Sequence, residues 1–463
     1  MNLKMCEKTN EWSFDRRGLL KAAGTFAAGI AVPWVVRSAS ASAVERPKQH
    51  LAALHAQIAK HLEEGIIPFW LKRAWDRQHG GFLTNFDERG GPYEMPEKYL
   101  NTQCRLLWWF STLTRHYPQR KEFKDLAVKG FDFIEKHFWD PKYGGWYWKI
   151  KRDGSPLDKG KVVYGQSFAI YATSEFYRST RDPRGLSYAQ KTFDLLQKYC
   201  ADTLRGGYFE NLKPDWTVEA PGFYAGDRKG LDTHMHLMEA FTVLFQASGE
   251  DVHRRKLMEI TDLIIKHMID PESGAGRNQF DLDFKPIPAI AINRTWNAER
   301  AGDKPAIPTD TTSYGHNIEL AWLMNRAVQE AKAAPGPYLK PMRGLLDHAV
   351  KNGVDWEYGG VYRDGTAKGA VLIKDKEFWQ NSEALVGFLD GYETFGDKVF
   401  LDAFEKVWEF ASKFMIIPGV GEWRTLLDRE GKPIDPKIGN PWKVSYHTGR
   451  AALECKLRLE KMK

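Results

Sequence analysis

Cysteine is scarce in this chain of 463 residues, with copies only at positions 6, 104, 200 and 455. That scatter excludes a disulfide framework and a Cys-x-x-Cys metal site. The zinc motif His-Glu-x-x-His is also missing. No basic run is interleaved with aromatic residues, so nothing indicates a nucleic-acid partner. We see no linker, low-complexity tract or second domain, and these absences favour one continuous domain.

The first 43 residues are expected to be an export signal. Arg16 and Arg17 form a twin-arginine element, an apolar run follows to Val36, and residues 41–43 (Ala-Ser-Ala) are typical of a cleavage site. The alternative is an uncleaved membrane anchor, but the run contains a lysine and a proline. We therefore expect the twin-arginine export machinery as a partner, a periplasmic or secreted location, and no stable membrane contact after the signal is removed.

A turn signature recurs along the remaining chain. It consists of an Asp, three residues, two glycines and an apolar residue. The clear copies are DRQHGGF from Asp76, DPKYGGW from Asp140, DTLRGGY from Asp202 and DWEYGGV from Asp355; DPESGAG from Asp270 and PGVGEW from Pro418 are degenerate. Repeats of roughly 60–85 residues indicate a stacked or closed array of one helical unit. We expect an all-α fold, an (α/α)₆ barrel with short β-hairpins in its loops, that forms one catalytic domain over residues 44–463.

Helical patterns of two kinds lie between these turns. The segments before the turns, such as KDLAVKGFDFIEKHFW, are amphipathic and are expected to form an outer ring. The segments after the turns are apolar on most of their circumference, as buried inner helices should be. The paired glycines are expected to end each outer helix at positive φ. A Pro-rich loop, residues 303–310, is a candidate for the cavity rim.

Polar residues gather at the starts of the expected inner helices. Any one of them, such as a histidine on an apolar helix, is ordinarily a hydrogen-bonded core residue. Together they predict one cavity lined from six helices. The set comprises Arg105, Tyr164, Gln166, His234, His236, Glu239, His316, Glu319, Trp379, Gln380, Glu383, His447 and Arg450.

Two kinds of chemistry suit these histidines. His234 and His236 could chelate a metal from a loop, and the spacing of His316 and Glu319 can ligate, but such a pair also forms for local helical reasons. Acid–base chemistry is favoured, because imidazole titrates near pH 6.5. We therefore expect neither a metal nor another cofactor.

Each of three histidines has a charged residue three positions later. A carboxylate there can fix the tautomer of the ring, and an arginine lowers the pKa of the imidazole and keeps it a free base. Facing histidines with an arginine for developing negative charge suit proton abstraction next to a carbonyl. The pairs are His236 with Glu239, His316 with Glu319, and His447 with Arg450.

Six ordered blocks of the sequence resemble the N-acylglucosamine 2-epimerase family, which includes cellobiose 2-epimerases and aldose–ketose isomerases. The resemblance extends from about Leu51 to the C-terminus. The blocks are CRLLWWFS from Cys104, YGQSFAIYA from Tyr164, THMHLMEAFTVLF from Thr233, YGHNIELAWLM from Tyr314, FWQNSEALVGFL from Phe378 and WKVSYHTGRAALE from Trp442.

The resemblance implies roles for individual residues. His316 and His447 correspond to the histidines that handle the proton at C2, and Arg105 to the arginine near O1 and O2. His236 and Glu319 complete the implied catalytic set. The expected sugar-binding residues are Trp379 and Trp442, which correspond to stacking aromatics, with Tyr164, Asp232, Glu383 and Arg450.

One departure from the family stands at Asp232, where many members have Asn. A charge at this position is expected to alter sugar contacts or to raise the pKa of His236, whereas the alternative is a helix cap in which Asn would serve nearly as well.

The sequence thus predicts an isomerase, a cofactor-independent sugar 2-epimerase or aldose–ketose isomerase acting on a mono- or disaccharide. Two alternatives stay open. A glycoside hydrolase on the same barrel would need a flanking carboxylate pair, with Asp232 and either Glu383 or Glu319 as candidates. A non-catalytic periplasmic sugar-binding protein would bind without exchanging protons.

Overall fold

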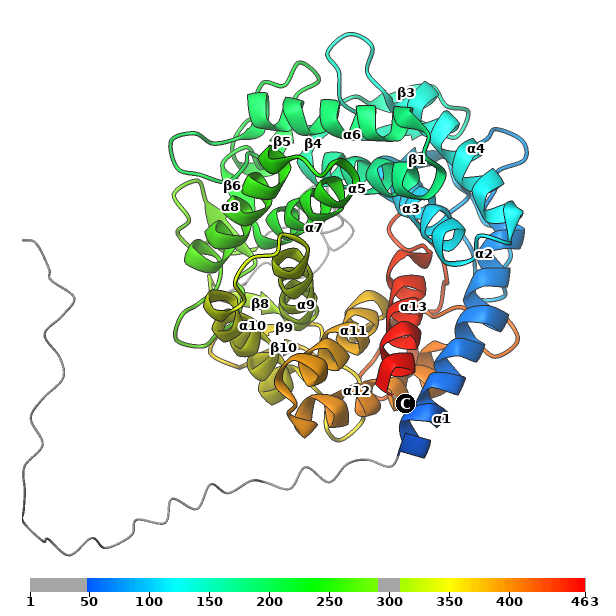
Figure 1. Ribbon diagram of the computed structural model, residues 1–463, viewed down its shortest axis with the longest axis vertical. Coiled ribbons are helices and arrows are strands. Elements are labelled where there is room, and N and C mark those ends of the chain that lie inside the picture. Colours follow the sequence, from blue (N-terminus) through cyan, green and yellow to red (C-terminus); the bar gives the residue numbers. More distant parts are fainter. Residues whose placement is uncertain (1–47, 290–308, 463) are drawn as a thin grey trace, which may run out of the picture. The chain divides into compact units, whose positions relative to one another are not determined.

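Helices alternate along the chain between a position near the centre of the molecule and a position outside it (Figure 1). The computed structural model describes residues 48–289 and 309–462. The expected signal, residues 1–43, and residues 303–308 of the Pro-rich loop lie outside these ranges. The described residues belong to one compact unit, and none of their helices is long and apolar enough to cross a membrane.

The inner helices coincide with the six sequence blocks. Almost every side chain in their first four turns is buried; in the first of them the buried run extends from Leu100 to Thr114. This burial confirms that apolar residues around most of the circumference mark a central helix. The inner helices are α3 (Leu100–His116), α5 (Val163–Thr180), α7 (Leu231–Ser248), α9 (Tyr314–Glu330), α11 (Phe378–Phe395) and α13 (Ser445–Met462).

The outer helices are amphipathic. In α4 the buried residues Phe123, Ala127, Phe131 and Ile134 recur at helical spacing and face the inner ring. The outer helices are α1 (Lys48–Lys60) with α2 (Ile67–Arg73), α4 (Lys121–Phe138), α6 (Pro183–Leu195), α8 (Asp251–His267), α10 (Gly336–His348) and α12 (Lys398–Phe410). π-helical turns at His61–Ile66, Leu196–Cys200, Ala349–Gly353 and Ala411–Met415 join or extend four of them, and a 3₁₀ turn covers Gly222–Tyr224.

Short strands connect successive helical units. The strand before an inner helix pairs antiparallel with a strand of the next unit, for example β1 with β2 through Lys98 and Ile150. The expected hairpins are present as β2–β3, β9–β10 and β12–β13. The strands are β1 (Glu97–Tyr99), β2 (Lys149–Lys151), β3 (Pro156–Asp158), β4 (Lys161–Val162), β5 (Asn211–Leu212), β6 (Arg228–Gly230), β7 (Gln279–Asp281), β8 (Thr311–Ser313), β9 (Asp364–Thr366), β10 (Val371–Ile373), β11 (Lys376–Glu377), β12 (Leu426–Leu427) and β13 (Pro433–Asp435).

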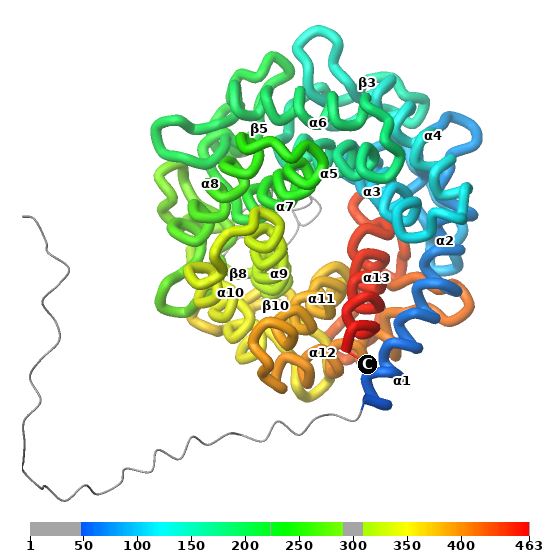
Figure 2. The backbone as a smooth tube through the Cα atoms, in the orientation of Figure 1, coloured from blue at the N-terminus to red at the C-terminus, as the bar shows by residue number. Residues whose placement is uncertain are grey.

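The last helical unit returns to the first. Each inner helix packs on the next, and α13 packs on both α3 and α1, as the backbone trace shows (Figure 2). A β-bridge between Phe86 and Gly439 joins the first and last loops. The inner helices therefore surround one centre, with their N-terminal ends at the same level as the strands.

The turn signature does not end the outer helices as expected. Helix α4 ends at Phe138, and the next residue is already extended. The glycines come later, where Gly144 and Gly145 close the turn that Asp140 opens, with φ of +70° and +68°. Asp140 Oδ1 accepts hydrogen bonds from the backbone N–H groups of Lys142 and Tyr143. The signature is therefore an Asx turn followed by two left-handed residues.

The second oxygen of the turn aspartate holds a buried lysine. Lys161, two residues before α5, lies 2.8 Å from Asp140 Oδ2, and both side chains are at most 3% exposed. Burial alone would raise the pKa of Asp140, but hydrogen bonds from Lys161 and the backbone outweigh it and lower the pKa below its usual value. Equivalent pairs are Lys98–Asp76, Lys229–Asp202, Lys376–Asp355 and, in the turn without an Asp, Lys443–Glu422.

A polar side chain at the fourth position of the inner helices completes this attachment. Gln103 and Gln166 each accept a hydrogen bond from the backbone N–H just after the paired glycines. Asn317 and Asn381 do the same in α9 and α11. In α7 this position is His234, whose Nε2 accepts from the Tyr208 N–H at 3.1 Å. Each turn is thus attached to the helix that follows it.

We expect Lys161→Met to lower the free energy of unfolding by about 3–5 kcal/mol, because it leaves the Asp140 carboxylate buried and unpaired. Lys256→Met is the matched control, since its partner Glu259 is 61% exposed and such pairs contribute about 0–1 kcal/mol. Denaturant unfolding measures both. The lowered pKa of Asp140 means that the ion pair stabilises the fold at neutral pH and loses this contribution as the pH falls through the aspartate range. Equal losses in the two variants would contradict the assignment.

Candidate active site

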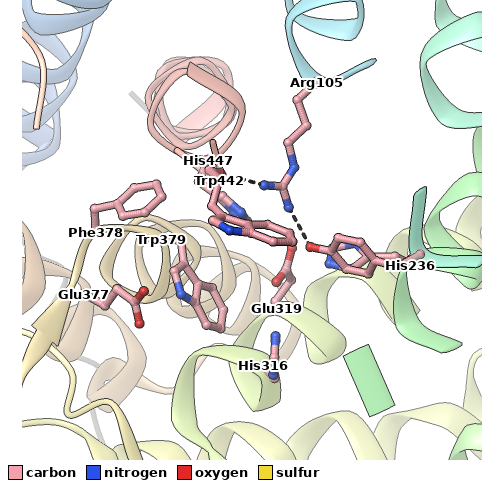
Figure 3. Close-up of a pocket in the computed structure, with 10 residues that line it drawn as sticks. Arg105, His236, His316, Glu319, Glu377, Phe378, Trp379, Trp442 and His447 are labelled. Atoms are coloured by element: carbon pink, nitrogen blue, oxygen red, sulfur yellow. Dashed lines mark hydrogen bonds between the residues drawn. The ribbon is translucent and has the colours of Figure 1, made fainter. Parts of the chain in front are cut away.

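The first two turns of the inner helices line a cavity that encloses about 400 Å³ of empty space, including space open to solvent. Its wall is drawn in Figure 3. The cavity brings together most of the residues predicted from the sequence. It is lined by Arg105, Tyr164, His236, His316, Glu319, Glu377, Phe378, Trp379, Trp442 and His447.

His447 is held by a carboxylate from a neighbouring helix. Its Nδ1 lies 2.7 Å from Glu383 Oε1, and Trp322 Nε1 donates to Glu383 Oε2 at 3.1 Å. With Glu383 as acceptor, Nδ1 carries the proton and Nε2 is left as the basic nitrogen. Burial first, and then the charges of Arg105 and Arg450, hold the pKa of His447 well below its usual value. The ring is therefore a neutral base at physiological pH.

His236 has its partner on its own helix, as the spacing predicted. Its Nδ1 lies 2.9 Å from Glu239 Oε2. Burial lowers the pKa of His236, although Glu239 opposes the shift. The ring packs edge-on against Tyr164, with 5.2 Å between centroids. His236 is thus a fixed, neutral imidazole in the cavity wall.

His316 and His447 both contact the indole of Trp379. The ring centroids lie 4.6 Å apart for His316 and 5.8 Å apart for His447. The backbone N–H of His316 donates to the Ser313 hydroxyl that caps α9, so the start of the helix fixes its position. The cavity therefore holds two histidines that contact one aromatic ring.

Arg105 brings a positive charge to the cavity. Its guanidinium donates to the Trp442 carbonyl at 2.9 Å and to the Tyr164 hydroxyl at 2.8 Å, and it lies over the ring of Phe168. Among the described residues it forms no ion pair with a carboxylate. Its charge is therefore available to an anion in the cavity.

Arg450 lies behind the wall and joins three carboxylates. One guanidinium nitrogen donates to Glu319 at 2.6 Å and to Glu383 at 2.8 Å, and the other binds Glu239. Arg450 is only 1% exposed. It was expected to bind sugar and to lower the pKa of His447. Its charge does lower that pKa, but Arg450 and Glu383 are not among the lining residues, because the two terminal nitrogens of Arg450 bind the three carboxylates.

Glu319 lies three residues after His316 on α9 and was expected to lie beside it. Its Oε1 accepts a hydrogen bond from Arg450, and both Glu319 and His316 line the cavity.

Two residues of α7, His234 and Asp232, are not among the residues that line the cavity. His234 Nδ1 donates to the Gly230 carbonyl and its Nε2 accepts from a turn, so it cannot join His236 at a metal. Asp232 accepts a hydrogen bond from the Thr233 N–H. Its charge also acts on Glu210, whose pKa is raised first by burial and then by Asp232. Burial raises the pKa of Asp232 to about 6. The expected pairing of Asp232 with His236 is therefore replaced by a pairing with Glu210.

Glu319, Glu383 and His447 also bring ligand-type atoms within 4.8 Å of one another. Arg450 already bridges the two carboxylates, so a metal ion would have to displace a buried guanidinium. Sequence reasoning missed two lining residues, Glu377, which precedes the block that contains Trp379, and Phe378, the first residue of that block. Their position at the start of α11 was the signal that could have found them.

Comparison with known proteins assigns the chain to a family. The sequence profile of the N-acylglucosamine 2-epimerase family matches residues 80–451. The chain belongs to this family.

Its relatives carry names of one reaction class. The chain is 29% identical over 408 residues to a cellobiose 2-epimerase of Bacteroides fragilis, covering 87% of this chain and 98% of that protein. It is 25% identical to a D-mannose isomerase of Marinomonas mediterranea, covering 85% and 95%. The structure of cellobiose 2-epimerase from Spirochaeta thermophila superimposes with a TM-score of 0.78 at 28% identity, covering 89% and 98%. These relatives confirm the predicted family and the prediction of a sugar epimerase or isomerase.

We expect His447→Ala to lower kcat by about 10²–10⁴-fold, because a positioned base is removed from the cavity. His234→Gln is the matched control, because His234 is also a buried histidine but its hydrogen bonds are to backbone groups. Glutamine already fills the equivalent helix position at Gln103 and Gln166. The control should retain the activity and the circular-dichroism spectrum of the parent. Steady-state kinetics on folded protein measures both. A His447→Ala enzyme with more than about a tenth of the parental kcat would contradict the assignment.

Proposed function

We propose that this chain is a cofactor-independent sugar 2-epimerase or aldose–ketose isomerase that moves the C2 proton of a mono- or disaccharide through an ene-diolate. The observation that carries the proposal is the pairing of His316 and His447 around Trp379, with the unpaired charge of Arg105 in the same cavity. Two imidazoles can take and return a proton without a metal or an organic cofactor.

The reaction begins with opening of the sugar ring to the free aldehyde. One histidine then removes the proton from C2, and the electron pair of that C–H bond forms the C1–C2 double bond. The carbonyl oxygen takes up negative charge, which Arg105 stabilises. Return of a proton to the opposite face of C2 by the other histidine gives the epimer. Return to C1, with transfer of the O2 proton to O1, gives the ketose.

The low pKa of His447 suits this role. A base must be unprotonated before it can act, and burial keeps this imidazole neutral through the physiological range. Trp379 and Trp442 supply apolar surface for the sugar ring, and the Tyr164 hydroxyl is oriented by its hydrogen bond from Arg105. These residues bind the substrate in the proposal.

The carboxylates support a glycoside hydrolase less well. Such an enzyme needs two carboxyl groups on either side of the scissile bond, about 5–9.5 Å apart. Glu319 and Glu383 instead share one guanidinium, and Asp232 pairs with Glu210. A non-catalytic sugar-binding protein would have no use for neutral, oriented imidazoles.

The fold and location complete the proposal. We take the inner and outer helices as a closed (α/α)₆ barrel over residues 44–463, supported by the packing of α13 on α3. The twin-arginine element at Arg16 and Arg17 supports export to the periplasm or beyond, with residues 1–43 removed by the export pathway.

Incubation of a sugar panel with the enzyme in deuterated water tests the reaction. We expect NMR to find deuterium at C2 of an epimer, at C1 of a ketose, or at both, because the transferred proton exchanges with solvent on the histidine. His447→Ala should abolish the label. Binding of a sugar without exchange would favour the non-catalytic alternative, and release of reducing ends from a glycoside without label would favour a hydrolase.

A further inference from the structure

A single arginine faces three buried carboxylates at the base of the cavity. Glu239 comes from α7, Glu319 from α9 and Glu383 from α11, and each is at most 4% exposed. The other titratable groups around them are His316, His447, Tyr446 and His236, and burial keeps the imidazoles of His447 and His236 neutral. Three ionised carboxylates would leave this cluster with excess negative charge, which a buried site disfavours strongly.

Two of the carboxylates are fully supplied with hydrogen-bond donors. Glu239 receives Arg450, His236 and, at 2.7 Å, the hydroxyl of Tyr446. Both oxygens therefore accept, as an ionised carboxylate should.

Glu383 is supplied in the same way. Its Oε1 lies 2.7 Å from His447 Nδ1 and 2.8 Å from Arg450, and its Oε2 accepts from Trp322. A proton on Oε1 would displace one of its two donors. Burial raises the pKa of Glu383, but the hydrogen bonds from His447, Arg450 and Trp322 suit its ionised form.

Glu319 is different. Its Oε1 accepts from Arg450 at 2.6 Å, but its Oε2 is buried without a hydrogen-bond partner among the described residues. An anionic oxygen in that situation would be desolvated and unpaired, which costs more than leaving a neutral group there. Burial first, and then the charge of Glu383, raise the pKa of Glu319 well above its usual value. The missing partner is explained if Oε2 carries a hydrogen and the sugar supplies the acceptor.

We propose that Glu319 is a neutral carboxylic acid in the resting enzyme and that its Oε2–H is the acid that protonates the substrate carbonyl oxygen. The inference rests on the proposed isomerase function and adds a donor that family membership does not specify. As a histidine removes the C2 proton, the C–H electron pair forms the C1–C2 double bond, the carbonyl π electrons move to O1, and O1 takes the proton from Glu319. When the carbonyl forms again, the ene-diol gives a proton back to Glu319, from O1 in the epimer and from O2 in the ketose, so no net proton is consumed.

Infrared spectroscopy of the wild-type protein and of the Glu319→Gln variant tests the protonation state of Glu319. We expect the carbonyl stretch of a protonated carboxyl group at neutral pH, shifted in deuterated water and lost in Glu319→Gln. Glu175→Gln is the matched control, because Glu175 is equally buried and bound by Arg115 and Arg178 away from the cavity, and it should keep the band. Absence of a protonated carboxyl band from the wild type would overturn the inference.

Kinetics of Glu319→Gln supply a second readout. Glutamine replaces one neutral group with another, so the pKa of His447, and with it the acid limb of the kcat/KM profile, should stay in place while kcat falls by about 10²–10⁴-fold. If Glu319 is ionised and merely positions Arg450, its replacement removes a negative charge near His447, lowers the pKa of that imidazole and moves the acid limb to lower pH. That shift would contradict the proposal.

Two further measurements keep the outcomes distinct. Should Glu319→Gln fail to fold, carbon-13 NMR of protein labelled at glutamate carboxyl carbons decides the same question, with Glu210→Gln used to remove the other glutamate whose pKa burial raises well above its usual value. One carboxyl should keep the shift of the acid through neutral pH in that variant, and its absence overturns the inference. Deuterium incorporation by the wild type tests the isomerase function separately. Incorporation without a protonated Glu319 would refute only the acid, whereas a protonated carboxyl without incorporation by any sugar would refute the reaction that it is proposed to serve.

Discussion

The buried guanidinium of Arg450 is the interaction on which the site depends. It carries the one fixed positive charge that Glu239, Glu319 and Glu383 share, and it ties α13 to three other inner helices. Two of those carboxylates in turn orient a histidine each. Without the guanidinium, three carboxyl groups would face one another in a desolvated space, and at least two would have to take up protons. The tautomers of the two imidazoles therefore follow from one cation that need not touch the substrate.

The loops bring these groups to a common level. In the four clear copies of the turn an aspartate caps the backbone with one oxygen and holds a buried lysine with the other, as Asp140 and Lys161 do. A polar residue at the fourth helix position then binds the backbone after the glycines. The third and sixth positions of the same helices are left to face the centre, and they supply His316, His447 and Arg105. In this repeat the residues that hold the turns are only one or two positions from the residues that line the cavity, which is why His234 is structural and His236 lines the cavity.

The repeat period and the apolar inner helices were visible in the sequence because both are local patterns, and they located the lining residues correctly at the helix starts. Partners across the ring were not visible. His447 meets a glutamate 64 residues away and Glu239 meets Arg450 211 residues away. No spacing within one helix could reveal these two contacts, whereas it did reveal the His236–Glu239 pair. The same limit explains Asp232: its neighbour Glu210 lies on the preceding loop, and no pattern within one helix points to it. The sequence indicated that the paired glycines adopt positive φ, and we therefore expected them at the helix ends. It did not show that the aspartate opens a separate turn between the end of the helix and the glycines.

The central claim is that His316 and His447 act on the same carbon from different sides while Arg105 holds the adjacent oxygen. A crystal structure of the enzyme with a linear sugar alcohol, which mimics the open-chain substrate but cannot react, tests it most directly. The account predicts that C2 of the alcohol lies between the two imidazoles, with O1 or O2 within hydrogen-bond distance of Arg105. An alcohol bound with both histidines on the same side of C2, or with its C1 and C2 away from Arg105, would contradict the account.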